Sequence, residues 1–179
     1  MGPKKAAATA DGEEEDISCE LLMKQYRKNC QTLQCDINKQ IKAAFDTEWT
    51  ENLIPIKKFH LWDDLGWQGI KALIDAAVAV NYKHCTSIRL WRSKCEDEGV
   101  RILVKFLLQA KTVAVFELLD AQVTKIGCEM ISKALLGQHS INLLVLKLDH
   151  NPIGSEGLKI LAQGISQNKQ LTSVSLTFC

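Results

Sequence analysis

The sequence lacks any stretch of the roughly 20 uninterrupted apolar residues that a membrane-spanning helix needs. Even the apolar run at residues 70–80 is interrupted by Lys71 and Asp75. The chain also lacks an excess of charge of either sign, because 22 Lys and Arg residues nearly cancel 21 Asp and Glu residues. Such a balance creates no strong overall field toward nucleic acid or anionic lipid. We therefore expect no membrane and no nucleic-acid partner, and recognition through a local surface.

Closely spaced metal ligands and paired cysteines are missing too. The seven cysteines are odd in number and irregularly spaced, with no Cys-x-x-Cys pair and no signal-peptide pattern before them. These features favour a reducing, cytoplasmic compartment over a disulfide framework. The four histidines lack the close spacing that a zinc site needs. We expect neither a metal nor a cofactor.

Catalytic motifs are likewise absent. The sequence has no Gly-x-x-x-x-Gly-Lys-Ser phosphate loop, no Gly-x-Ser-x-Gly elbow and no His-Glu-x-x-His helix. The nearest approach to an acid/base cluster is His60 with Asp63 and Asp64, for which a polar strand edge is the simpler interpretation. We predict that the chain is not an enzyme and has no small-molecule substrate.

The first 52 residues divide into two segments. Residues 1–15 combine lysines, alanines and a Glu13–Glu15 run without large apolar residues after Met1, which predicts a disordered tail. Residues 16–52 carry apolar residues mostly three or four apart, which predicts a helical leader, with a break near Cys35 and Asp36. One interpretation is a cap on the end of the following domain, and the other is a free helix that binds a partner.

Residues 53–179 contain a repeat. Five segments share one apolar spacing, and the last apolar residue of each is Leu61, Leu90, Leu118, Leu148 or Leu176, so the period is 28 to 30 residues. A helical pattern follows each of the middle segments, as in 99–108 and 157–165. Each repeat is thus predicted to form a strand, a turn and a helix. A glycine in the turn indicates tight packing or a positive φ, at Gly69, Gly99, Gly127 and Gly157.

The repeat resembles a known family. The spacing Leu143-x-x-Leu146-x-Leu148-x-x-Asn151 resembles the leucine-rich repeat, and the period with a full helix is similar to its ribonuclease-inhibitor-like subclass. The resemblance covers residues 56–179. It implies an α/β solenoid, with curved parallel strands inside, helices outside and an N-terminal helical cap, that binds other proteins. The subclass has Asn or Cys at the ninth position, and this chain departs from it at Ser93 and Ala121.

The resemblance suggests two functions. Residues 26–30 and the helical stripe after them are similar to the leader of leucine-rich-repeat proteins of cilia and centrosomes. This similarity implies a scaffold, a structural subunit within a large cytoskeletal assembly such as the ciliary axoneme. The alternative is a regulator of an enzyme, such as a small-GTPase activator or a nuclease inhibitor. A fragment of a nucleotide-binding receptor is a third interpretation, although no nucleotide-binding domain lies in the chain.

Alternate strand residues should line the concave face of such a solenoid. The seventh positions place Trp62, Trp91 and Leu119 on this face as an apolar ladder. The fifth positions add charges that alternate in sign, which would fix how a partner is aligned on the face. The ladder is predicted to anchor a protein partner, unless the N-terminal helices cover it. The predicted contact residues are Trp62, Trp91, Leu119, His60, Arg89, Glu117 and Lys147.

The last repeat stops after its strand, at Cys179. We expect this repeat to expose inner-face residues and the isolated chain to associate or to be poorly soluble.

Overall fold

The computed structural model describes residues 16–137 and 141–179, so the predicted tail at residues 1–15 lies outside the described residues. The elements form two layers. The helices are α1 (Ser18–Leu33), α2 (Lys39–Ala44), the π-helix η1 (Phe45–Thr50), α3 (Gly66–Ala79), α4 (Glu96–Ala110), α5 (Lys125–Leu136) and α6 (Gly154–Gln167). The strands are β1 (Lys58–Leu61), β2 (Ser87–Trp91), β3 (Val115–Leu119), β4 (Val145–Lys147) and β5 (Ser173–Ser175). None of the described helices is both long and apolar enough to cross a membrane.

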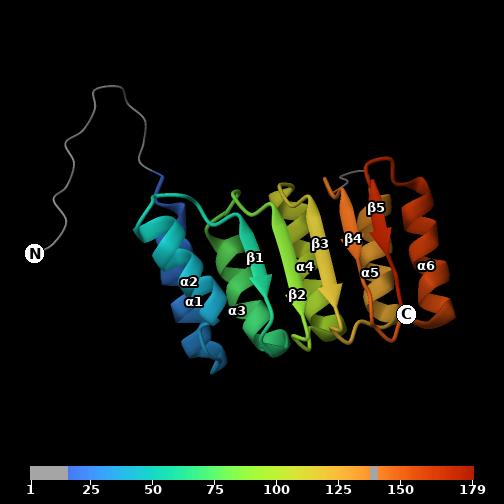
Figure 1. Cartoon of the computed structure of the whole chain (residues 1–179), viewed down its shortest axis with the longest axis horizontal. Helices are drawn as coiled ribbons and strands as arrows, with labels where there is room; N and C mark the ends of the chain where they lie inside the picture. The colour runs from blue at the N-terminus through green and yellow to red at the C-terminus, as the bar shows by residue number, and fades with distance from the viewer. Residues whose placement is uncertain (1–15, 138–140) are drawn as a thin grey trace, which may run out of the picture.

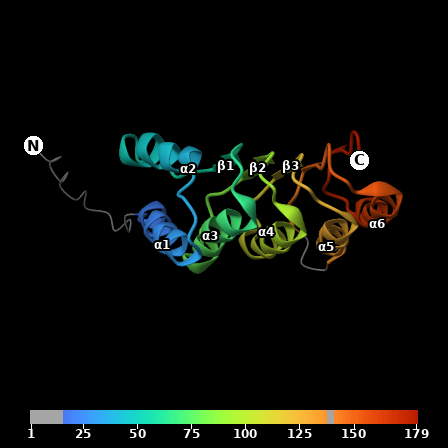
Figure 2. The ribbon, with the colours of Figure 1, turned by 90° about the horizontal axis from the view of Figure 1, so that it is seen from below.

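The five strands form one parallel sheet in the order β1-β2-β3-β4-β5 (Figure 1). Helices α3 to α6 lie side by side against one face of this sheet (Figure 2). Each strand therefore passes through a helix to the next parallel strand, as the repeat predicted. The fold is an α/β leucine-rich-repeat solenoid, and the second face of its sheet is free of these helices.

The core lies between the sheet and the helices. The fourth and sixth positions of the first four repeats point into it, and Phe59, Ile88, Phe116 and Leu146 are at most 1% exposed. This confirms the predicted core positions of β1 to β4. Val174, at the same position in β5, is 40% exposed because β5 lies at the edge of the sheet.

The turn glycines serve close packing. A Cβ at Gly157 would lie 2.5 Å from Cγ2 of Ile153 and 3.2 Å from the Cα of Lys125 in the preceding repeat. The positive φ offered as the alternative is wrong for the predicted glycines. It occurs instead at Gly66 (φ +59°) and Gly154 (φ +67°), at the starts of α3 and α6.

The ninth position joins successive repeats, as the resemblance implied. The buried Asn151 accepts hydrogen bonds from the backbone N–H groups of Ala121 (2.9 Å) and Val123 (3.0 Å). Its amide also donates to the carbonyl oxygen of Leu118 at 2.7 Å. Ser93 occupies the same position in the second repeat, and its buried hydroxyl has no hydrogen-bond partner among the described residues.

The N-terminal helices extend both layers. Helix α1 packs beside α3, and α2 lies beside β1 on the strand side (Figures 1 and 2). The break between them covers residues 34–38, where the apolar pattern predicted one. Two contacts tie α1 to its surroundings: the hydroxyl of Tyr82 lies 3.0 Å from the thiol of Cys19, and that of Tyr26 accepts from the N–H of Asn38.

Candidate protein-interaction surface

The free face of the sheet carries the predicted columns of side chains. Strand pairing places His60 beside Arg89, Arg89 beside Glu117, and Glu117 beside Lys147. These four residues form the fifth-position column. The register derived from the repeat is therefore the register of the sheet.

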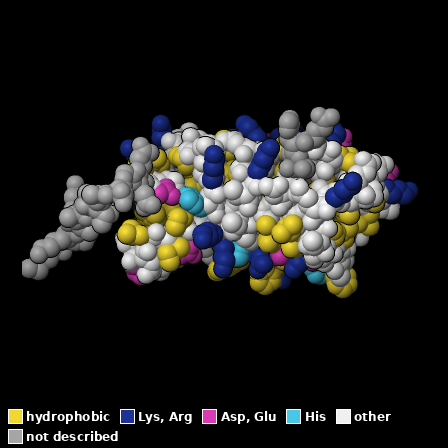
Figure 3. Space-filling view, turned by 90° about the horizontal axis from the view of Figure 1, so that it is seen from above, with side chains coloured by type: hydrophobic (Ala, Val, Ile, Leu, Met, Phe, Trp, Pro, Cys, Tyr) yellow, Lys and Arg dark blue, Asp and Glu magenta, His cyan; other side chains and the backbone are white. Residues whose placement is uncertain are grey.

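The seventh positions form an exposed apolar ladder of Trp62, Trp91 and Leu119. Trp91 and Leu119 are paired on β2 and β3, and Trp62 follows the end of β1. Trp62 is 58% exposed and Trp91 54%, whereas Leu119 is half-buried. The N-terminal helices thus leave both indole rings open to solvent. In Figure 3 the sheet face runs along the lower margin, where hydrophobic and basic side chains lie among histidine and acidic ones.

Glu117 corrects one expectation. It lies on the predicted face, but it is only 6% exposed and cannot be a free contact residue. Its carboxylate oxygens lie 3.3 Å from Nε of Arg89 and 3.3 Å from Nζ of Lys147. The two longer side chains on the neighbouring strands cover the carboxylate, and their charges compensate its burial. Sequence alternation could not show this, because it gives the face of a residue but not what lies over it.

His60 does not form the acid/base cluster that its neighbours in sequence suggested. Its Nε2 lies 2.8 Å from the hydroxyl of Ser87 on β2. Asp63 accepts instead from Gln40, and Asp64 pairs with Lys94. Burial and the positive charges nearby lower the pKa of His60 below its ordinary value of 6.5. The imidazole is therefore neutral near pH 7 and belongs to the polar edge of the strand.

Sequence reasoning missed a second aromatic group on this side. Beyond the ladder, the eighth position of the second to fifth repeats has a left-handed backbone: φ is +53° at Arg92, +50° at Asp120, +60° at His150 and +56° at Phe178. The Arg92 guanidinium lies 5.4 Å from the Trp91 ring, and the rings of His150 and Phe178 stack at 4.9 Å. With Asp120 these residues line a shallow hollow of about 430 Å³. Apart from Trp91, their signal in the sequence is position alone, the eighth in the second to fifth repeats.

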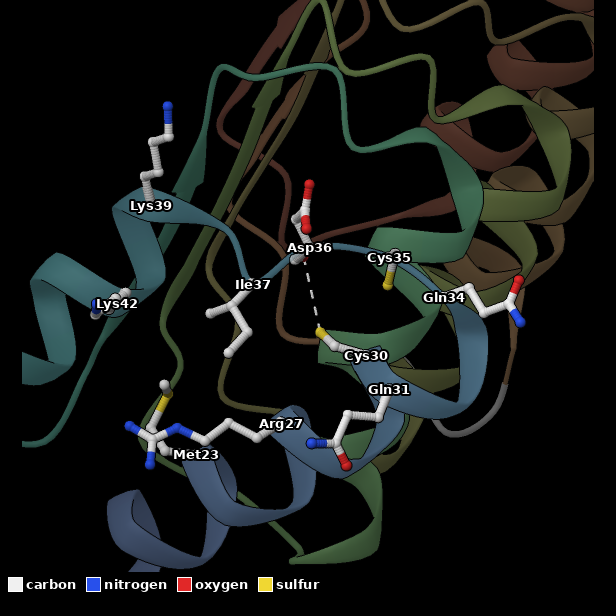
Figure 4. Close-up of a pocket in the computed structure, with 10 residues that line it drawn as sticks. All are labelled: Met23, Arg27, Cys30, Gln31, Gln34, Cys35, Asp36, Ile37, Lys39 and Lys42. Carbon is white, nitrogen blue, oxygen red and sulfur yellow. Dashed lines mark hydrogen bonds between the residues drawn. The ribbon is translucent and has the colours of Figure 1, made fainter.

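A larger hollow, of about 850 Å³, lies between α1, α2 and the chain that joins them (Figure 4). Its lining includes the cations Arg27, Lys39 and Lys42 and the thiol of Cys30. Burial, with the neighbouring Cys35, raises the pKa of the Cys30 thiol to about 12. That thiol donates to the carbonyl oxygen of Asp36 and stays protonated at pH 7, so Cys30 is not a thiolate nucleophile.

A metal site would need acidic, cysteine or histidine side chains that converge on one point. Within residues 16–137 and 141–179, no group of three or more such side chains is placed to hold a metal ion. The feature of this face with the clearest binding character is therefore the apolar ladder beside its charged column.

Comparison with known proteins agrees with this architecture. No family model matches the chain. Ribonuclease inhibitor from Mus musculus is 27% identical over 146 residues, which cover 78% of this chain and 31% of the inhibitor. The human NACHT, LRR and PYD domains-containing protein 13 is 26% identical over 149 residues, covering 82% of this chain and 14% of that protein. The chain thus spans less than a third of either relative, and both similarities support a ribonuclease-inhibitor-like leucine-rich-repeat protein.

Proposed function

We propose that the chain is a non-enzymatic scaffold that binds another protein through the free face of its sheet. The observation that carries this proposal is the exposed ladder of Trp62, Trp91 and Leu119. Tryptophan is enriched among interface hot spots because it buries a large area and loses little side-chain conformational entropy on binding. Two indole rings more than half exposed, one on β2 and one directly after β1, form an anchor of this kind.

The similarity to other leucine-rich-repeat proteins supports a binding role, and two buried thiols have a structural rather than a catalytic environment. Burial raises the pKa of Cys85 and of Cys128 to about 12. Both therefore remain protonated at pH 7 and pack as small apolar groups. These thiols serve the solenoid core rather than catalysis.

The proposal is tested by photo-crosslinking in cells. Trp62→benzoylphenylalanine places a photoreactive aromatic ring on the ladder, and Leu108→benzoylphenylalanine places the same group on α4, at a side chain 39% exposed. We expect a discrete crosslinked protein from position 62 that position 108 does not produce. Identical products at both positions, or none at position 62, would reject binding through the sheet face.

We further propose that the partner belongs to a large cytoskeletal assembly, such as the ciliary axoneme. The support is the resemblance of residues 26–30 and the helical stripe after them to the leaders of ciliary leucine-rich-repeat proteins. Isolated axonemes from ciliated cells should contain the protein after detergent and salt washing. Its complete recovery in the detergent-soluble fraction would exclude an axonemal subunit while leaving the scaffold proposal intact.

The similarity to mouse ribonuclease inhibitor favours a second candidate, a regulator of an enzyme. The matched residues cover 31% of that inhibitor. Ribonuclease activity and GTP hydrolysis by small GTPases, each measured with and without the purified chain, test this alternative directly. A stoichiometric change in either rate would make the regulator the better description.

A further inference from the structure

The free sheet face is basic beside its apolar ladder. Lys58, Arg89 and Lys147, named here the basic band, lie on β1, β2 and β4. Lys58 is exposed, and the side chains of Arg89 and Lys147 are 50% and 38% exposed. Glu117, on β3 between Arg89 and Lys147, is the acidic residue of the fifth-position column, and its side chain is 8% exposed. A partner therefore meets cations on this side of the ladder.

The buried carboxylate of Glu117 also holds two of these cations in place. One oxygen contacts Nε of Arg89 and the other contacts Nζ of Lys147, each at 3.3 Å. Because the contact with Arg89 uses Nε, the two terminal nitrogens of the guanidinium can bind a partner's carboxylate in bidentate fashion. Fixed side chains lose less entropy on binding than mobile ones do.

The pKa of His60, beside Arg89 in the sheet, agrees with this positive environment. The pKa of His60 is lowered first by burial and then by the charges of Arg89 and Lys58, with Glu117 acting in the opposite direction. The cations thus outweigh the buried carboxylate at the position of this ring.

Two acidic side chains near the ladder are already engaged: Asp120 lies one residue beyond it, and Asp149 follows Leu119 in the seventh-position column. Asp120 pairs with Arg92 at 3.5 Å, and Asp149 accepts hydrogen bonds from the Ser175 hydroxyl and the Thr177 N–H. Beyond the ladder, acidic and basic side chains pair with one another, as Asp120 does with Arg92 and Asp64 with Lys94. At the third and fifth strand positions of the described residues, by contrast, the exposed charges are the cations of the basic band. This asymmetry gives a bound segment a preferred orientation.

The spacing of the columns suits a helix. Parallel strands lie about 4.8 Å apart, so the three ladder residues cover roughly 10 Å, and the basic band lies two to four residues back along the strands. Helical residues three or four apart are neighbours at about 5–6 Å, so successive turns can contact successive strands. A helix on the ladder would present its adjacent stripe to the basic band.

Building on the proposed function, we infer that this face binds an amphipathic helix of a protein partner, with an apolar stripe on the ladder and an acidic stripe on Lys58, Arg89 and Lys147. The apolar stripe supplies most of the affinity, and the acidic stripe supplies orientation and selection against basic segments.

Two synthetic peptides of about 15 residues, long enough to form helix, test this inference. Both carry a leucine stripe, beside which one has glutamates and the other lysines at the same positions. Fluorescence anisotropy with the purified chain should show at least about tenfold tighter binding of the glutamate peptide, with the preference reduced by added salt. Equal affinities, a preference for the lysine peptide, or no binding of either would overturn the inference.

Variants with the same change of net charge locate the effect. Arg89→Glu with Lys147→Glu should abolish the preference for the glutamate peptide, whereas Lys105→Glu with Lys159→Glu, on the helical layer, should leave it unchanged. Circular dichroism establishes that each variant folds. If the carboxylates placed beside Glu117 prevent folding, Lys58→Glu provides the test, because this exposed side chain lies at the start of β1. It should weaken glutamate-peptide binding by at least about threefold, and an unchanged affinity would overturn the inference.

The two proposals fail in different ways. If position 62 crosslinks to a partner but the two peptides bind with equal affinity, the scaffold proposal is retained and the inference of an acidic helix is rejected. If position 62 yields no crosslink, the scaffold itself fails, whichever peptide binds.

Discussion

Asn151 accepts a hydrogen bond from the backbone N–H of Ala121 at 2.9 Å, so a side chain of the fourth repeat holds the loop of the third. The same side chain reaches Val123 and Leu118, and each of these contacts joins two repeats. A solenoid repeat contacts only its neighbours, so such bonds carry the cooperativity of folding along the stack.

Asn151→Ala should lower the free energy of unfolding by roughly 3 kcal/mol, because it leaves two buried N–H groups and a carbonyl oxygen without this partner. Urea denaturation followed by circular dichroism measures the change. Asn142→Ala is the matched control, since the exposed Asn142 donates to Lys111 alone among the described residues. A similar loss of stability in both variants would mean that Asn151 stabilises the fold no more than an exposed asparagine does.

Ser93→Ala should have the opposite effect on the free energy of unfolding, although Ser93 stands at the same, ninth position of another repeat. The hydroxyl of Ser93 is fully buried and has no partner among the described residues, so its removal should raise the free energy of unfolding by about 1 kcal/mol. The same urea experiment applies. A marked destabilisation would mean that the hydroxyl has a partner such as a buried water.

Asp97→Ala should lower the free energy of unfolding by about 2 kcal/mol. Its carboxylate, on α4, accepts from the N–H groups of Thr124 and Gly127 and from the Thr124 hydroxyl at the start of α5. The substitution leaves donors at a helix N-terminus without this acceptor. Glu98→Ala, which removes an exposed pair with Arg101, should change stability by less than about 0.5 kcal/mol. Equal effects would contradict the assignment.

His60 should titrate below its ordinary pKa of 6.5. Between its lowered pKa and 6.5 the unfolded state binds more protons than the native state, so the contribution of His60 to stability is full above pH 6.5 and declines as the pH falls. NMR titration of the ring measures the pKa directly. Arg89→Gln should raise it by removing a nearby cation, whereas Lys105→Gln on the helical layer should not. An unchanged pKa of His60 in Arg89→Gln would contradict the claim that the charge of Arg89 lowers it.

Trp91→Ala should weaken partner binding by about 2 kcal/mol while the fold survives, and Trp62→Ala should have a smaller effect in the same direction. Both rings are more than half exposed, so their loss leaves no core cavity. Affinity for the crosslinked partner and the thermal unfolding curve are measured together. Leu108→Ala, on the helical layer, is the control. A collapse of the melting temperature in Trp91→Ala would place the ring in the core instead.

Much of the fold could be predicted because it is periodic. The core residues recur at fixed strand positions, and the period of 28 to 30 residues places the strands in register. Arg89, Glu117 and Lys147 could therefore be placed in one column from the sequence alone. The exposure of the column could not be predicted in the same way. Glu117 is buried because its two neighbours cover it, and that depends on side-chain lengths and positions rather than on alternation.

The sequence by itself determined the repeat, the parallel sheet with its helical layer, and the face on which each strand residue lies, because these follow from local periodicity. The tertiary structure decided what the periodicity leaves open. It showed that the N-terminal helices leave Trp62 and Trp91 exposed, that His60 contacts Ser87 rather than the nearby aspartates, and that two cations share one buried carboxylate. These features arise between strands about 28 residues apart in the chain, where packing in space, not order in sequence, sets which side chains meet.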